Sequence, residues 1–124
     1  MRVVGGVAMG IEIRPAQALR LLHRNALRQT RDASPDLTLR QTAILLTVYL
    51  EPPPHTVRGL ASKLSVAKPV VTRALDTMGR LELLERRRDP ADLRNVLVRR
   101  TVKGSLYVSQ MADRLVDEAG ALSR

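Results

Sequence analysis

The chain has no cysteine, tryptophan or phenylalanine among its 124 residues, and only two tyrosines and two histidines. Without cysteine, disulfide bonds, thiolate catalysis and thiol-based redox sensing are all excluded. The histidines, His23 and His55, lie far apart with no carboxylate cluster beside them, so we predict no metal site and no cofactor. Scarce aromatic side chains argue against the stacking platforms that bind single-stranded DNA or RNA.

The sequence also lacks the residue groups of an active site, and we predict that the protein is not an enzyme. Asp89 and Asp92 lie in a basic segment, and His55 follows a run of prolines. The apolar N-terminal run is interrupted by glycines, stops at Glu12 and is too short to span a bilayer. We expect residues 1–13 to form a flexible or packing arm, and the protein to be cytoplasmic and nucleoid-associated, without a membrane partner.

Positive charge is abundant and concentrated in one segment. The formal net charge is +9, and residues 56–103 hold 12 Lys and Arg residues against 5 Asp and Glu. A charge excess gathered on one segment is typical of a protein that binds a polyanion. Together with the scarcity of aromatics, it favours double-stranded DNA as the partner.

Helical spacing of apolar residues predicts a first helix from Pro15 to about Thr30, within a region of residues 14–36 that ends in a turn. Its apolar stripe consists of Ala18, Leu19, Leu21, Leu22, Ala26 and Leu27. An opposing row of arginines is expected to be an exposed face. Its members are Arg20, Arg24, Arg28 and Arg31. His23 is either an ordinary packed or exposed side chain or part of an effector pocket or pH sensor.

A second helix is predicted to begin after Thr38, which with Gln41 forms a capping box, and to end before the prolines at 52–54. Its inward residues are Ile44, Leu45, Val48 and Tyr49. Thr56 then caps a short helix. The buried face of that helix consists of Val57, Leu60, Ala61 and Leu64.

A tight turn at residues 65–67 leads into a helix over residues 68–81, with Pro69 in its first turn. Its expected core stripe is Val70, Ala74, Leu75, Met78 and Leu81. The end that meets base edges in helix-turn-helix docking carries Lys68, Val71, Thr72 and Arg73. Two strands, residues 84–88 and 96–100, follow around a hairpin tip at 89–95. Thr101 caps a last helix, whose apolar side consists of Leu106, Met111, Leu115, Ala119 and Leu122. The expected fold is mainly α with a small β-hairpin wing, a winged helix-turn-helix over residues 37–101.

The chain resembles the MarR family of bacterial repressors from about Leu37 to Gly104. The order and spacing of five motifs together carry this resemblance: LTLRQ (37–41), TVRGLASKL (56–64), VAKPVVTRALD (66–76), ERRRDPADLR (85–94) and RTVKG (100–104). It implies a homodimeric transcriptional regulator that binds double-stranded DNA, with the helix at about 68–81 in the major groove and the wing at about 84–100 in the minor groove.

The resemblance also implies roles for particular residues. Those facing the major groove would be Lys68, Pro69, Val70, Thr72 and Arg73. In the wing, Arg94 would enter the minor groove, and Asp92 would either orient Arg94 or stabilise the turn. Arg86, Arg87 and Arg88 would contact phosphates, or be simply solvated. The remaining expected contacts to the DNA backbone are Thr56, Arg58 and Lys63.

The sequence departs from the family pattern at three places. Glu82 stands where the family has a glycine after the recognition helix, and Ala67 where it often has a capping Ser or Thr. After Lys103 only one helix is expected, where family members have two. The dimer would then use the first helix (14–36) and the C-terminal helix (102–124), with the apolar residues 3–13 as a candidate replacement surface, and any small-molecule effector pocket would be reduced or rebuilt. An alternative is a winged-helix interaction module that acts on polymerase or another regulator without an operator of its own.

Overall fold

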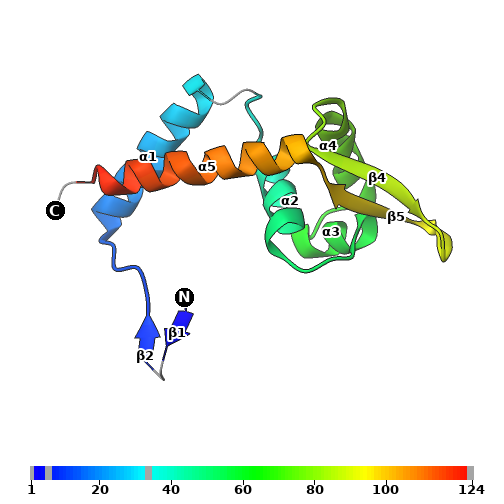
Figure 1. Ribbon diagram of the computed structural model, residues 1–124, viewed down its shortest axis with the longest axis horizontal. Helices are drawn as coiled ribbons and strands as arrows, with labels where there is room; N and C mark the ends of the chain where they lie inside the picture. The colour runs from blue at the N-terminus through cyan, green and yellow to red at the C-terminus, as the bar shows by residue number, and fades with distance from the viewer. Residues whose placement is uncertain (1, 5–6, 33–34, 123–124) are drawn as a thin grey trace. The chain divides into compact units, whose positions relative to one another are not determined.

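The structure, a computed structural model, describes residues 2–4, 7–32 and 35–122. The chain divides into two compact units: unit 1 comprises Met1–Ala33 and Asp113–Arg124, and unit 2 comprises Ser34–Ala112. Figure 1 shows the helices and strands of both units. In chain order they are β1 (Arg2–Val4), β2 (Val7–Met9), α1 (Pro15–Asp32), α2 (Leu39–Leu50), β3 (His55–Thr56), α3 (Val57–Leu64), α4 (Lys68–Arg80), β4 (Leu84–Asp89), β5 (Asp92–Arg100) and α5 (Val102–Gly120).

Unit 2 is a winged helix-turn-helix, as the sequence predicted. Helices α2, α3 and α4 pack with the first half of α5 around one apolar core, and the antiparallel sheet has the strand order β3-β5-β4. The buried core residues are Ile44, Leu45, Val48, Leu60, Ala61, Val71, Ala74, Leu75, Met78, Leu83, Leu84, Val98 and Tyr107. The third strand, β3, was not predicted; its two residues follow the proline run and pair with Val98 and Leu97 of β5.

The predicted caps of α2 and α3 are confirmed. Thr38 Oγ1 accepts a hydrogen bond from Gln41 N at 3.1 Å, and Gln41 Oε1 accepts one from Thr38 N at 2.9 Å, which completes the capping box. Thr56 Oγ1 accepts a hydrogen bond from Gly59 N at 2.9 Å at the start of α3. Ala67, at the start of α4, provides no side-chain cap, as expected from the departure at that position. The first-turn N–H groups of α4 therefore lack the side-chain acceptor that α2 and α3 have.

The backbone geometry at the C-terminal end of α4 explains why the family pattern has a glycine where this chain has Glu82. Glu82 has a φ of 61°, in the left-handed region. Its N–H donates to Gly79 O at 3.0 Å and Leu83 N–H donates to Met78 O at 2.9 Å, the two bonds of a Schellman motif. This geometry favours glycine because any Cβ crowds the backbone there.

Replacing Glu82 by glycine is expected to raise the free energy of unfolding by about 0.5–1 kcal/mol. The gain is the relieved left-handed strain, about 1–2 kcal/mol, minus the extra conformational entropy that glycine brings to the unfolded chain. Urea denaturation of both proteins measures it. Glu82→Ala is the control, since alanine keeps the strained φ and also loses the weak, exposed ion pair to Lys103. An equal gain from both variants would contradict the argument.

The wing, made of β4 and β5, is longer than predicted. The strands reach Asp89 and begin again at Asp92, so the tip is only Pro90 and Ala91 instead of residues 89–95. Side chains at the tip form hydrogen bonds with backbone groups that the strand pairing leaves without a partner. Asp89 Oδ1 accepts a hydrogen bond from Ala91 N at 2.9 Å, and Leu93 O accepts one from Arg88 Nη1 at 2.7 Å. Polar residues that normally indicate a loop thus complete a hairpin here.

The junction between the wing and α5 is organised by Tyr49. Its hydroxyl lies 3.1 Å from both Leu83 O and Thr101 O, and it accepts a hydrogen bond from Thr101 N at 3.1 Å. Thr101 Oγ1 caps α5 by accepting from Gly104 N at 2.9 Å, as predicted. Arg100 donates to Val48 O at 3.0 Å and lies over the Tyr49 ring. The start of α5 is therefore fixed to α2 and to the base of the wing.

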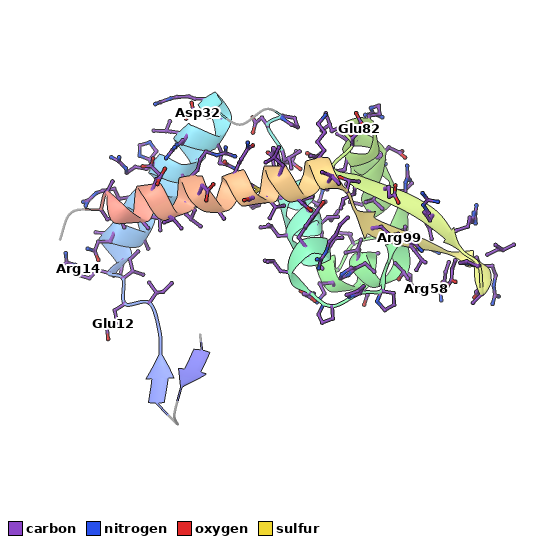
Figure 2. All side chains as sticks on the ribbon, in the orientation of Figure 1. Glu12, Arg14, Asp32, Arg58, Glu82 and Arg99 are labelled. Atoms are coloured by element: carbon purple, nitrogen blue, oxygen red, sulfur yellow. The ribbon has the colours of Figure 1, made fainter. Side chains whose placement is uncertain are left out.

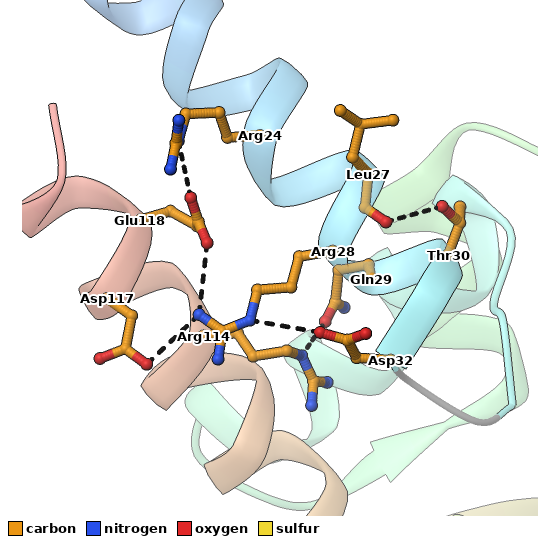
Figure 3. Close-up of polar contacts among 9 residues, drawn as sticks. All are labelled: Arg24, Leu27, Arg28, Gln29, Thr30, Asp32, Arg114, Asp117 and Glu118. Atoms are coloured by element: carbon orange, nitrogen blue, oxygen red, sulfur yellow. Dashed lines mark hydrogen bonds and ion pairs between the residues drawn. The ribbon is translucent and has the colours of Figure 1, made fainter.

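In unit 1, the predicted exposed arginine row of α1 is confirmed for Arg20, Arg24 and Arg31, whereas Arg28 is half-buried. Arg24 and Arg28 also bind Glu118 and Asp117 of α5, contacts that the sequence did not predict (Figure 3). The Arg24 Nε to Glu118 Oε1 distance is 2.7 Å, and this bond, with further help from Arg28, holds the pKa of the Glu118 carboxyl below its ordinary value. Figure 3 also shows Arg114 donating to Gln29. Ionic and polar contacts therefore link the two helices here, which apolar periodicity alone did not predict.

The predicted apolar stripes of both terminal helices are exposed in large part. On α1, Leu19 and Leu22 are 68% and 66% exposed, and no residue of α1 is buried. On α5, Met111 of the predicted side packs against the core of unit 2, but Leu106 and Leu115 are exposed, and the buried residues Gly104 and Tyr107 were not predicted. In the N-terminal arm, β1 pairs antiparallel with β2, and Ile11 is exposed. Residues 1, 5–6 and 33–34, within the predicted arm and turn, lie outside the described residues.

Candidate nucleic-acid interface

Helix α4 presents the side chains expected to read DNA, with one correction. Lys68, Pro69 and Arg73 are exposed and Thr72 is half-buried. Val71, placed at the end that meets base edges, is instead fully buried in the core. Val70, assigned both to the core stripe and to the major groove, is only half-buried. The two valines are adjacent, so a helical rotation of about 100° separates their roles.

The two flanks of α4 border two hollows within unit 2. On one flank Lys68 and Thr72 line a recess of about 240 Å³ between α4 and the wing, the wing-side recess. The rest of its lining is Thr56, Val57, Arg58, Arg86, Arg94, Asn95 and Val96. On the other flank Val70 and Arg73 line an open groove of about 680 Å³ against α2, the α2–α4 groove. The expected major-groove residues therefore divide between the two sides of one helix, with Pro69 bordering neither hollow.

The tip of the wing carries a braced arginine. Arg94 Nε donates to Asp92 Oδ1 at 3.1 Å, its Nη2 donates to Asp92 Oδ2 at 3.3 Å, and its backbone N–H donates to Oδ1 at 3.1 Å. These bonds lower the pKa of the Asp92 carboxyl, so it stays charged under mildly acidic conditions. The Arg94 side chain is still 88% exposed. The carboxylate thus orients the guanidinium without covering it, the arrangement expected from the resemblance.

Three neighbouring arginines of β4 are already engaged within the chain. Arg86 Nη2 bonds Asp76 Oδ1 of α4 at 2.6 Å, Arg87 pairs with Glu85 at 3.1 Å, and Arg88 donates to Leu93 O. A phosphate would have to compete with these partners. Sequence reasoning missed Asp76, although its spacing from Lys68 and Thr72 places all three on the wing-facing side of α4.

The residues expected to contact the DNA backbone differ in how free they are. The Thr56 hydroxyl is occupied as the cap of α3, and Lys63 Nζ pairs with Glu51 Oε1 at 2.7 Å. Arg58 is exposed, lines the wing-side recess and acts on the Asp92 carboxylate through its charge. Figure 2 shows Arg58 and Arg99 in the part of unit 2 that carries the wing. Arg58 is therefore the member of this set that is best placed for an anion.

Two features of the described residues bear on other classes of function. Over residues 2–4, 7–32 and 35–122, no group of three or more His, Cys, Asp or Glu side chains could hold a metal ion. His23 is exposed on α1, and His55 Nε2 lies 3.0 Å from Glu51 O. No helix in the described part of the chain is long and apolar enough to cross a membrane.

Comparison with known proteins identifies the fold. The sequence model of the MarR family matches residues 37–96. The transcriptional regulator Tm0710 from Thermotoga maritima is 26% identical, with a TM-score of 0.67 over 82% of this chain and 70% of that one. The crystal structure of MarR is 25% identical, with a TM-score of 0.62 over 84% and 80%.

The S. aureus MepR–DNA complex has the same fold at 22% identity, with a TM-score of 0.63 over 86% of this chain and 77% of that one. No curated protein sequence matches the chain. Residues 37–96 contain α2, α3, α4 and most of the wing. The chain is therefore MarR-like: the MarR family model matches residues 37–96, and the solved structures with the same fold are transcriptional regulators.

Proposed function

We propose that the protein is a sequence-specific regulator that binds double-stranded DNA with α4 in the major groove and the wing in the minor groove. The observation that carries this proposal is a pair of exposed arginines, one on α4 and one on the wing. Arg73 is exposed on α4, and Arg94 is exposed and braced at the wing tip. The major groove admits a helix, and a narrow minor groove attracts an inserted arginine.

The charge of the site supports the same function. Lys68, Arg58 and Arg94 surround the wing-side recess, which contains no acidic residue in its lining. A phosphate that approaches this recess meets several cations at once. MepR, which has the same fold, was solved as a DNA complex, so the fold is compatible with this binding mode.

The protein acts as a homodimer in this proposal. Leu19 and Leu22 expose apolar surface on α1, and Leu115 and Val116 do so on the part of α5 that belongs to unit 1. Exposed apolar side chains clustered on two helices are typical of a surface that packs against another protein. A second copy presents the same side chains, so the pair is self-complementary and reads two half-sites about one helical turn apart.

Replacing Arg73 by alanine is expected to reduce affinity for the operator by roughly 10- to 100-fold and to relax sequence preference at one base-pair position per half-site. The loss corresponds to one bidentate arginine–guanine contact, about 1–3 kcal/mol. Selection from a random duplex library with both proteins measures the change in motif. Binding that is as tight and as selective as before would contradict the assignment of α4. Capture of a protein partner without any duplex binding at low salt would favour the interaction-module alternative.

A further inference from the structure

The second hollow beside α4 was not expected from the sequence. The α2–α4 groove is lined on one side by the first turns of α2 and on the other by α4. Its lining contains two cations, Arg40 and Arg73, and no acidic residue. Arg40 therefore borders the same groove as the arginine that we assign to base reading. The charge of the groove is complementary to a polyanion.

These two cations are also unengaged, unlike Arg86, Arg87 and Arg94 of the wing. Within the described residues, the guanidinium groups of Arg40 and Arg73 have no hydrogen bond or ion pair to the protein. Arg86 and Arg87, in contrast, each pair with a carboxylate. An arginine without an internal partner binds phosphate at no cost in broken ion pairs. Among the described residues, cations without an internal ion pair or hydrogen bond thus lie on the α2 side of α4 as well as beside the wing-side recess, where Lys68 and Arg58 lie.

Duplex geometry gives the α2 side a specific partner. The major groove is about 12 Å wide, and a helix that fills it has one phosphate backbone on each side. If the wing-side recess faces one strand, the opposite flank of α4 faces the other strand. We infer that the α2–α4 groove receives the second strand's backbone, with Arg40 bound to a phosphate. This inference rests on the proposed function and adds a contact surface to it.

Neighbouring residues fit the same occupant. Leu39 is 87% exposed beside Arg40 on this rim, where the apolar edge of a deoxyribose would cover it in the complex. Arg40 also lies in the first turn of α2, where a cation opposes the helix dipole and helix stability favours an acid. The charge of Arg40 therefore does not stabilise its own helix, which fits a role in binding.

The test compares Arg40→Gln with Lys103→Gln. Both residues are the second position of a helix that is capped by threonine, and both substitutions remove one positive charge. Lys103 borders neither the groove nor the wing-side recess. Binding to a mixed-sequence duplex is measured over a series of salt concentrations, because a phosphate contact is independent of sequence. Thermal unfolding of each variant verifies that it is folded.

Arg40→Gln is expected to weaken binding roughly tenfold near 0.1 M salt and to reduce the slope of log K against log salt by about 1 per bound chain. Lys103→Gln should change the affinity and the salt slope less than Arg40→Gln does. Equal effects of the two substitutions would overturn the inference. The proposed function would still stand in that case, provided that the wild type binds duplex DNA and Arg73→Ala changes the selected motif. Absence of duplex binding by the wild type would overturn both.

A second readout localises the contact. On a duplex selected from random sequences, ethylation of the phosphates bound by Arg40 should interfere with binding of the wild type and not with binding of Arg40→Gln. These phosphates should lie on the strand across the major groove from those whose interference disappears in Arg94→Gln. If ethylation interference disappeared at the same phosphates in both variants, the placement of the two strands would be contradicted.

Discussion

Replacing Gly104 by alanine is expected to lower the free energy of unfolding by about 3 kcal/mol or more, a large part of the total stability of a domain this size. A Cβ at this position would overlap the hydroxyl of Tyr49 and the carbonyl oxygen of Leu83. One obstacle is backbone, so rotating a side chain away does not relieve the clash. Moving Tyr49 would break its hydrogen bonds to Leu83 and Thr101 and leave partly buried polar groups unpaired.

Gly79 provides the matched control in another helix of unit 2. A Cβ at Gly79 would meet no atom within 4 Å, and the residue is exposed near the end of α4. Gly79→Ala should therefore raise the free energy of unfolding by up to about 1 kcal/mol, the difference in helix propensity. Urea denaturation followed by circular dichroism measures both variants. Shifts of the same sign would show that the close approach around Gly104 is misjudged.

Replacing Leu22 by glutamate is expected to give a monomer whose affinity for the operator is about 100-fold lower or more. The residue is 66% exposed in the single chain, so the change costs that chain little stability. In the proposed dimer it would place a charge in an apolar interface, which is strongly unfavourable. A monomer loses the effective concentration that links binding of two half-sites, which contributes about 10²–10⁴ to affinity.

Light scattering after size-exclusion chromatography reports the mass, and titration of a labelled operator reports the affinity. Arg20→Gln is the control because it changes the net charge equally on the same helix, outside the stripe formed by Leu19 and Leu22. It should leave the mass unchanged. A wild-type protein that is monomeric at binding concentrations, or a Leu22→Glu variant that remains dimeric, would contradict the proposed interface.

Local rules predicted the central part of the fold. The capping box of Thr38 and Gln41, the cap at Thr56 and the turn before α4 each depend on residues within four positions of one another. The core of α2 followed from helical spacing for the same reason. The strained end of α4 was also foreseeable, because a family glycine replaced by Glu82 implied a position that disfavours a side chain.

Contacts between distant segments could not be predicted. The contacts of α1 with α5 use Arg24 and Arg28, which meet carboxylates about 90 positions away, and its apolar stripe gave no sign of them. Pairing of Arg86 with Asp76 depends on how the wing leaves α4, and the short strand β3 depends on a free edge of β5. The α2–α4 groove is likewise a tertiary feature, and no motif in the sequence marks Arg40.

The internal pairing of the wing arginines affects how a DNA-binding regulator distributes itself over a chromosome. Weak binding to random DNA comes almost entirely from phosphate neutralisation, and a genome offers about 10⁶–10⁹ such competing sites. Carboxylates that partly neutralise Arg86 and Arg87 reduce this background attraction. The base-reading contacts proposed for Arg73 do not involve these pairs. A smaller share of the molecules is then sequestered on irrelevant DNA, so fewer copies per cell suffice to keep an operator occupied.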